Sequence, residues 1–162
     1  VFTAQLRIAA DHNLPASIHC LKAWGRLLEL LEQGPLPSRG FLLHSYGGSA
    51  EMIGPLAKLG AYFSFPGYYM REAKGRQREA FTQVPPDRLL IETDAPDQLL
   101  PEEMREYALD DPEGNPINHP ANLRGVYRFM AKMLDEPLEK LEENHHQFPY
   151  VKCPHKFLSM DQ

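Results

Sequence analysis

The sequence predicts an α/β fold assembled from successive strand–helix units. Short apolar segments alternate with helical patterns, and the apolar segments recur about every 20 to 30 residues, the length of a strand with its crossover helix. No two of these segments are joined by an Asn-Gly or Asp-Gly pair at hairpin spacing. Together the two observations favour parallel strands in at least four βα units over an antiparallel sheet.

The apolar segments and helical patterns define the expected elements. The strands are expected at residues 16–20, 40–45, 60–65 and 88–94. The crossover helices are expected at residues 21–32, 49–59 and 70–83, and a last helix at 121–134. An amphipathic helix is also expected at the start, where Phe2, Leu6 and Ile8 recur at helical spacing. Because no Met precedes this helix, we expect further sequence upstream.

The region after the fourth strand shows little periodicity. Residues 99–120 are rich in proline and acidic side chains and are expected to form a loop, and residues 136–162 are expected to form an irregular tail. The acidic run Asp110-Asp111-Pro112-Glu113 lacks the spacing of a calcium-binding loop. It is interpreted as a solvated loop.

Composition restricts the class of protein. The 162 residues fit one domain, and the net charge of −5 and pI of about 5.8 are opposite to the basic surface of a protein that holds nucleic acid by charge alone. Cys20 and Cys153 provide no disulfide framework, and no segment is long and apolar enough to span a bilayer. We therefore expect a cytoplasmic protein without a membrane partner.

Polar side chains are found where the predicted strands end. His19 lies in the first strand, His44 in the second, and Glu92 and Asp94 at the end of the fourth. The carboxyl ends of parallel strands form one rim, which is where such folds collect their chemistry. Two imidazoles and a carboxylate on that rim suit a divalent metal ion. Glu92 lies two residues before Asp94, on the same side of the strand, and is expected to support a ligand histidine.

Each of these residues also has a structural explanation when taken alone. A histidine at a strand end is commonly hydrogen-bonded without any ligand, and Asp94 before Ala-Pro can cap a turn. The metal interpretation rests on the combination.

Two further groups of residues were considered. Gly47, Gly48 and Ser49 allow close backbone approach before a helix, which makes a phosphate-binding loop possible, although such capped turns are common. Four residues of the tail, His145, His146, Cys153 and His155, are metal-ligand types. Their spacing is irregular and lacks paired CxxC arms, so a solvated tail is the preferred interpretation.

Three stretches, "IHCLKAWGRLLELL", "LLHSYGGSAEM" and "LLIETDAP", in that order and spacing, resemble the C-terminal half of the TatD family of metal-dependent hydrolases. The later "NHPANLRGVYRFMAKMLDEPLEKLEENHHQF" is similar to the closing segment of that family. The resemblance extends to about residue 148. We therefore expect a TatD-like domain at residues 1–148 and a divergent tail at 149–162.

The resemblance implies a TIM-barrel metallohydrolase in which His19, His44 and Asp94 are ligands of one or two divalent ions, such as magnesium, manganese or zinc. The His-x-His strand and the bridging glutamate of the family have no counterpart here, so only about four of the eight βα units are expected. An open half barrel exposes a strand edge and an apolar side. Its expected partners are the missing N-terminal half or a second copy.

The leading functional hypothesis is a TatD-type hydrolase that cleaves DNA or another phosphodiester by metal-activated water, with Asp94 as the catalytic base. Two alternatives stay open. The same ligands could hydrolyse an amide or a small ester, because nothing in the sequence reads a nucleobase. A truncated, inactive chain could instead act as an interaction module.

Overall fold

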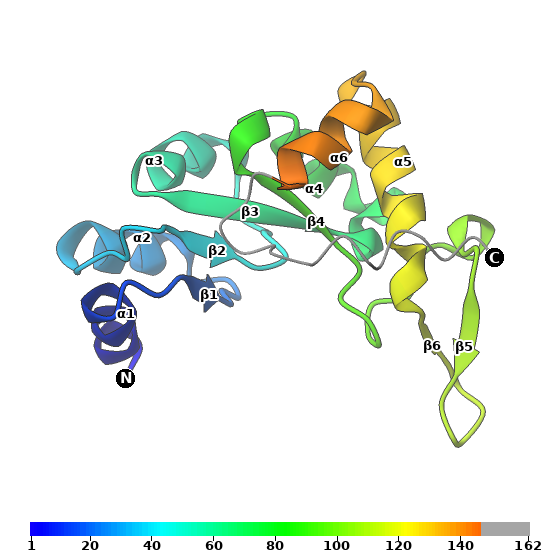
Figure 1. Ribbon diagram of the computed structural model, residues 1–162, viewed down its shortest axis with the longest axis horizontal. Coiled ribbons are helices and arrows are strands. Elements are labelled where there is room, and N and C mark those ends of the chain that lie inside the picture. Colours follow the sequence, from blue (N-terminus) through cyan, green and yellow to red (C-terminus); the bar gives the residue numbers. More distant parts are fainter. Residues whose placement is uncertain (147–162) are drawn as a thin grey trace.

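Four parallel strands form the central sheet of the computed structural model, which describes residues 1–146 and only the backbone of 144–146 (Figure 1). They are β1 (Ala16–Ile18), β2 (Phe41–Leu43), β3 (Ala61–Pro66) and β4 (Leu89–Glu92), in the spatial order β1-β2-β3-β4. Every neighbouring pair is parallel. Because the spatial order follows the chain order, each crossover leads to the adjacent strand, as in part of a (β/α) barrel. The predicted fold class is confirmed.

Helical segments connect the strands and differ from the predicted helices mainly at their ends. Helix α1 (Phe2–Asp11) precedes β1, and α2 (Trp24–Gln33) connects β1 to β2. The second crossover contains the 3₁₀ turn η1 (Ala50–Met52) and α3 (Ile53–Lys58). The third contains η2 (Gly67–Met70), η3 (Glu72–Lys74), α4 (Gly75–Phe81) and η4 (Pro86–Arg88). Thus each predicted crossover helix exists, although two of them are shorter and begin as 3₁₀ turns.

An aromatic cluster joins the sheet to its helices. Phe65 on β3 and Phe81 on α4 are fully buried and meet edge to face, with 5.0 Å between ring centroids. Tyr46, which follows β2, is 1% exposed and makes a similar contact with Phe63 at 5.0 Å. Edge-to-face contacts of this kind stabilise a core beyond the area that they bury. The cluster therefore anchors the segment after β2 against the sheet.

The C-terminal part contains elements that the periodicity did not indicate. The turn η5 (Glu102–Met104) leads to an antiparallel hairpin of β5 (Ala108–Asp110) and β6 (Pro116–Asn118), which projects from the rest of the molecule (Figure 1). The turn η6 (Pro120–Asn122), helix α5 (Leu123–Leu134) and helix α6 (Leu138–His146) follow. The expected loop at 99–120 therefore contains a hairpin, and the expected irregular tail from residue 136 begins with helix α6. Both expectations are wrong at these residues.

Exposure explains why the hairpin was missed. All of β5 is exposed, so its side chains do not alternate between apolar and polar. The hairpin turn is held locally, since the Asp111 carboxylate accepts a hydrogen bond from the Asn115 backbone amide at 2.7 Å. Gly114 adopts a φ of +83°, which side chains disfavour. The acidic run is thus part of a defined turn rather than only a solvated loop.

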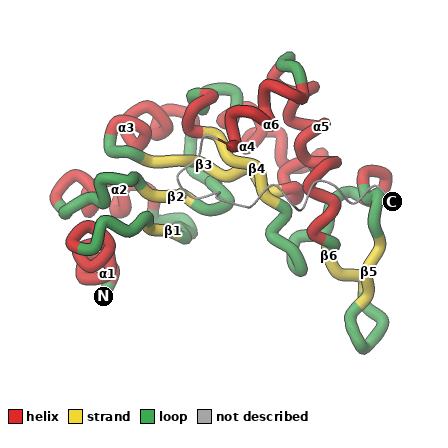
Figure 2. The backbone as a smooth tube through the Cα atoms, viewed as in Figure 1, coloured by secondary structure: helices red, strands yellow, loops and turns green. Residues whose placement is uncertain are grey.

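The strand ends that matter for function lie along one rim of the sheet. Figure 2 shows the four strands in a row with the loops that follow them. Strands β1 and β4 form the two edges of this sheet.

Among the described residues, no helix is long and apolar enough to cross a membrane.

Candidate metal centre

The residues predicted at three strand ends meet around His44. His19 follows β1 directly, His44 follows β2, and Asp94 lies two residues after β4. The His44 Nε2 atom is 3.1 Å from a Glu92 oxygen and 3.3 Å from Asp94 Oδ1. The ring of His19 lies against that of His44, with 4.4 Å between centroids. The tertiary structure thus gathers all four side chains.

The carboxylate of Glu92 is held by the backbone that follows β2. The Ser45 amide donates to Glu92 Oε1 at 3.0 Å, and the Ser45 hydroxyl donates to the same oxygen at 2.7 Å. Ser45 has a φ of +48°, and its amide also lies 2.9 Å from the Ser64 hydroxyl. These contacts fix one oxygen of Glu92, and the other oxygen lies 3.1 Å from His44 Nε2, the same ring nitrogen that faces Asp94. Support of a ligand histidine by Glu92 stays a prediction, because such support uses the ring nitrogen that does not bind the metal.

A buried tyrosine supports the same turn. The Tyr69 hydroxyl donates to the Ser45 carbonyl at 2.9 Å. Burial, reinforced by the negative charge of Glu92, raises the pKa of Tyr69 to about 12. The hydroxyl therefore stays protonated and remains a donor at physiological pH.

The loop that carries Asp94 is held by two amide side chains. Asp94 itself adopts a φ of +60°, and its Oδ2 atom accepts a hydrogen bond from the Gln98 side chain. Asn118, which is fully buried, donates from its side chain to the Thr93 carbonyl at 2.8 Å and to the Gln98 carbonyl at 3.3 Å. Its backbone amide donates to the Pro96 carbonyl at 2.8 Å. The β6 end of the hairpin therefore positions the loop.

The charge and spacing of these groups suit a divalent cation. Oxygens of Glu92 and Asp94 both lie near His44 Nε2, and within the described part of the chain neither carboxylate forms an ion pair with a lysine or arginine. Donors bound to a single ion at about 2.1 Å lie about 3.0–3.4 Å apart, which is the spacing around His44. The His44 Nδ1 atom is also buried without a hydrogen-bond partner. A cation would offset the concentrated negative charge.

The side chains at this site do not yet have the geometry of a metal-binding site. The described residues contain no group of three or more histidine, cysteine and carboxylate side chains arranged to hold a metal ion together. The pairwise distances show why: His44 contacts both carboxylates directly, and His19 contacts the ring of His44 from an exposed position. Since these side chains already touch, small rotations of them would open room for an ion.

Comparisons with known proteins decide the family. The model of the family "TatD related DNase" matches residues 1–149. The chain belongs to the TatD family. This confirms the resemblance noted in the sequence, and the match covers every residue that the structure describes.

Individual TatD relatives agree with this assignment. The chain is 37% identical over 131 residues to the 3′-5′ ssDNA/RNA exonuclease TatD of Escherichia coli K12, a match covering 80% of this chain and 48% of that protein. The protein of the same name from Klebsiella pneumoniae is 32% identical over 142 residues, with coverages of 87% and 52%. The chain spans about half the length of the curated relatives it matches.

Solved structures support the fold. A TatD homologue from Escherichia coli K12 superposes with a TM-score of 0.72 at 25% identity, covering 86% of this chain and 50% of that one. An uncharacterized amidohydrolase from Saccharomyces cerevisiae gives the same TM-score at 19% identity, with coverages of 91% and 57%. The second likeness shows the fold alone.

In this TatD chain, Tyr46 supports the glycine loop, which consists of Gly47, Gly48 and Ser49. The buried Tyr46 hydroxyl donates to the Ser49 carbonyl at 2.8 Å. A Cβ atom at Gly48 would lie 2.4 Å from that hydroxyl, so glycine is required there. Ser49 occupies the predicted cap position but its side chain caps no backbone amide. Its hydrogen bond to Glu51 is the main reason why the pKa of the Glu51 carboxyl is lowered. Phosphate binding by this loop stays a prediction.

Several supporting residues were missed by the sequence analysis. Ser45, Ser64, Tyr69 and Asn118 act through hydrogen bonds between segments distant in the chain. Gln98 donates to Asp94, four residues earlier. The only local signal was the Asn at the start of "NHPAN", which the sequence analysis used for resemblance and not for chemistry. The alternative tail cluster lies outside the described side chains: those of His145 and His146 and the whole of Cys153 and His155.

Proposed function

We propose that this chain contributes the ligands His19, His44 and Asp94 to a divalent-metal-dependent TatD hydrolase that cleaves phosphodiester bonds. The observation that carries the proposal is the position of His44 Nε2 between two carboxylate oxygens, at 3.1 and 3.3 Å. Membership of the TatD family and the names of the exonuclease relatives favour nucleic acid as substrate. One or two ions of magnesium, manganese or zinc fit the nitrogen and oxygen donors.

The proposed chemistry assigns each side chain a task. A bound divalent ion would stabilise negative charge on the phosphoryl oxygens and lower the pKa of a nearby water. Asp94 accepts the proton of the attacking water at its carboxylate, because its Oδ1 atom faces the centre while Oδ2 is held by Gln98. Glu92, held in place by Ser45, brings a second negative charge to His44 Nε2, where the ion would bind.

Metal binding tests the ligand assignment directly. We expect the metal-stripped chain to bind Mn²⁺ or Zn²⁺ with defined stoichiometry in calorimetry. Asp94→Ala should abolish that binding or weaken it at least about tenfold, because it removes an anionic donor. Asp97→Ala is the matched control, since Asp97 is an exposed aspartate of the same loop. Equal affinity of Asp94→Ala and the wild type for the metal ion would contradict the assignment of Asp94 as a ligand.

The type of bond cleaved needs a separate assay. The metal-loaded chain should accelerate release of p-nitrophenol from bis(p-nitrophenyl) phosphate, relative to the reaction with metal alone, more than it accelerates release from p-nitrophenyl acetate. The reverse preference would favour the amide or ester hydrolase. Metal binding without any hydrolysis, together with a dimer in size-exclusion chromatography, would favour an inactive interaction module.

A further inference from the structure

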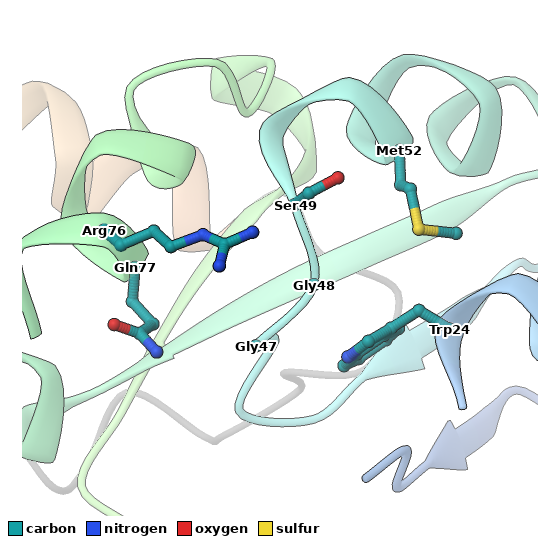
Figure 3. Close-up of a pocket in the computed structure, with 7 residues that line it drawn as sticks. All are labelled: Trp24, Gly47, Gly48, Ser49, Met52, Arg76 and Gln77. Atoms are coloured by element: carbon teal, nitrogen blue, oxygen red, sulfur yellow. The ribbon is translucent and has the colours of Figure 1, made fainter. Parts of the chain in front are cut away.

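A pocket of about 240 Å³ lies over the glycine loop, which follows His44 in the chain. Figure 3 shows Trp24 and Met52 on one side of the loop and Arg76 and Gln77 on the other. The lining residues are Trp24, Gly47, Gly48, Ser49, Met52, Arg76 and Gln77. We propose that this pocket binds one nucleotide unit of a single-stranded nucleic acid, with the base against Trp24 and the phosphate near Arg76. The proposal deepens the proposed phosphodiester hydrolysis and rests on it.

Trp24 offers a fixed aromatic surface. It is the first residue of α2 and is only partly buried, so part of the indole remains accessible. Its ring meets the buried ring of Tyr46 at an angle of 66°, with 4.7 Å between centroids. An edge contact with a core residue restricts the indole while leaving surface for another partner. Single-stranded nucleic acids bind by stacking their bases on side chains of this kind.

Arg76 provides the charge that a phosphate requires. It lies in the first turn of α4, is exposed, and extends its guanidinium toward the glycine loop (Figure 3). Within the described part of the chain no carboxylate forms an ion pair with it. The positive charge of Arg76 contributes to the lowered pKa of the Glu51 carboxyl. Guanidinium groups bind phosphate oxygens through paired, charge-assisted hydrogen bonds.

The loop between these side chains leaves room for a ligand. Gly47 and Gly48 place no side chain in the pocket, and the two tyrosine hydroxyls beneath them are already engaged. A Cβ atom at Gly47 would lie 3.2 Å from the Tyr69 hydroxyl, so this position is also tight. A base or phosphate can therefore approach the loop backbone closely.

The position of the pocket links it to the reaction. His44 and Gly48 are four residues apart, which limits their separation to about 14 Å. A strand whose phosphodiester lies at His44 and Asp94 can thus place a neighbouring nucleotide between Trp24 and Arg76. This pocket would supply a base contact next to the proposed site of cleavage.

Trp24 also provides the readout, because it is the single tryptophan of the chain. We would follow its fluorescence in the metal-free chain during titration with deoxyadenosine 5′-monophosphate, deoxyadenosine and inorganic phosphate. Saturable quenching by the monophosphate is expected, at lower concentration than for deoxyadenosine, and no quenching by phosphate. Arg76→Gln should weaken the monophosphate at least about fivefold while leaving deoxyadenosine unchanged.

Controls separate the pocket from other effects. Arg124→Gln removes the same charge from an exposed position on α5 and should change nothing. In Trp24→Ala the ³¹P signal of the monophosphate should no longer shift on addition of protein, whereas Trp24→Phe should retain most of the shift by stacking.

The titration also separates failure of the pocket from failure of the proposed function. It needs no metal and no turnover, so quenching that persists in Asp94→Ala supports the pocket whatever the metal assay shows. Non-saturable quenching, or equal affinity in Arg76→Gln and wild type, would overturn the pocket and leave the ligand assignment untouched.

Discussion

The candidate centre depends on a few residues that hold others in place. Glu92 receives two hydrogen bonds from Ser45, and Asp94 lies in a loop that Asn118 ties down. Side chains that meet a metal need this kind of support, since outer hydrogen bonds set their orientation. The residue scale is therefore where the positioning of the proposed ligands can be tested.

Replacing Asn118 tests the support of Asp94. Asn118→Ala removes three side-chain hydrogen bonds from a fully buried position: two that Asn118 donates to the Thr93 and Gln98 carbonyls, and one that it accepts from the Asn122 side chain at 3.4 Å. We expect a loss of about 2–3 kcal/mol in the free energy of unfolding. We also expect Mn²⁺ affinity to fall about tenfold. Urea denaturation and calorimetry measure the two effects.

The exposed hairpin residue Asn115 gives a matched control, as Asn115→Ala should leave Mn²⁺ affinity unchanged. If Asn118→Ala lowers stability but binds Mn²⁺ as well as the wild type, Asn118 supports the fold alone.

Gly48 tests the construction of the glycine loop. Gly48→Ala places a Cβ atom 2.4 Å from the Tyr46 hydroxyl, so the loop or the tyrosine must move. We expect a loss of about 1–3 kcal/mol in urea denaturation, together with a shift in the fluorescence of Trp24, whose ring touches Tyr46. Gly54→Ala has open space around its Cβ and should be neutral. Unchanged stability and emission in Gly48→Ala would contradict the requirement for glycine at this position.

At the scale of elements, the hairpin and helix α5 are joined through a second buried amide. Asn122 is 1% exposed, and its side-chain oxygen accepts from the Glu106 and Tyr107 amides at 3.1 and 2.9 Å. Its side-chain nitrogen donates to the Tyr107 carbonyl at 3.0 Å. One residue at the start of α5 thus satisfies backbone groups at the start of the hairpin.

Removing this amide should loosen the hairpin without touching the sheet. Asn122→Ala leaves two backbone donors and one acceptor unpaired, so we expect a loss of about 2–4 kcal/mol in stability. Hydrogen exchange should accelerate at Glu106 and Tyr107 while the amides of β3 stay protected. Protection factors at Glu106 and Tyr107 equal to those of the wild type would show that other contacts hold the hairpin.

At the scale of the whole molecule, three buried or partly buried tyrosines should make the folded state less stable at alkaline pH. Burial raises the pKa of Tyr46, Tyr69 and Tyr127, to about 12 in the case of Tyr69. A raised pKa means that the folded state favours the neutral phenol. The resulting stability is complete below the unfolded value of about 10 and is lost as the pH rises to about 12.

The contribution of Tyr69 can be measured by its removal. Between pH 9 and 12, wild-type stability should fall more steeply than that of Tyr69→Phe, by at most about 2–3 kcal/mol. Urea denaturation at intervals across this range measures the two slopes. The comparison uses slopes because the substitution also removes the hydrogen bond to Ser45 at every pH. Parallel slopes would show that Tyr69 does not titrate differently in the folded state.

The sequence by itself determined the strand–helix order and the ligand candidates. Both follow from local patterns: apolar runs specify β2 and β4, and the residues that follow them, His44 and Asp94, must lie at one rim of a parallel sheet. Family membership follows from the same motifs. These features need no knowledge of long-range contacts.

Only the tertiary structure decided what supports and surrounds those candidates. Asn118 meets Thr93 across 25 residues, Ser45 meets Glu92 across 47, and Trp24 shares a pocket with Arg76 on a different helix. The exposed strand β5 likewise has no alternation of apolar and polar side chains by which the sequence could predict it. Hydrogen bonds and pockets between distant segments leave no periodic trace in a sequence, because they depend on how the elements pack rather than on which elements form.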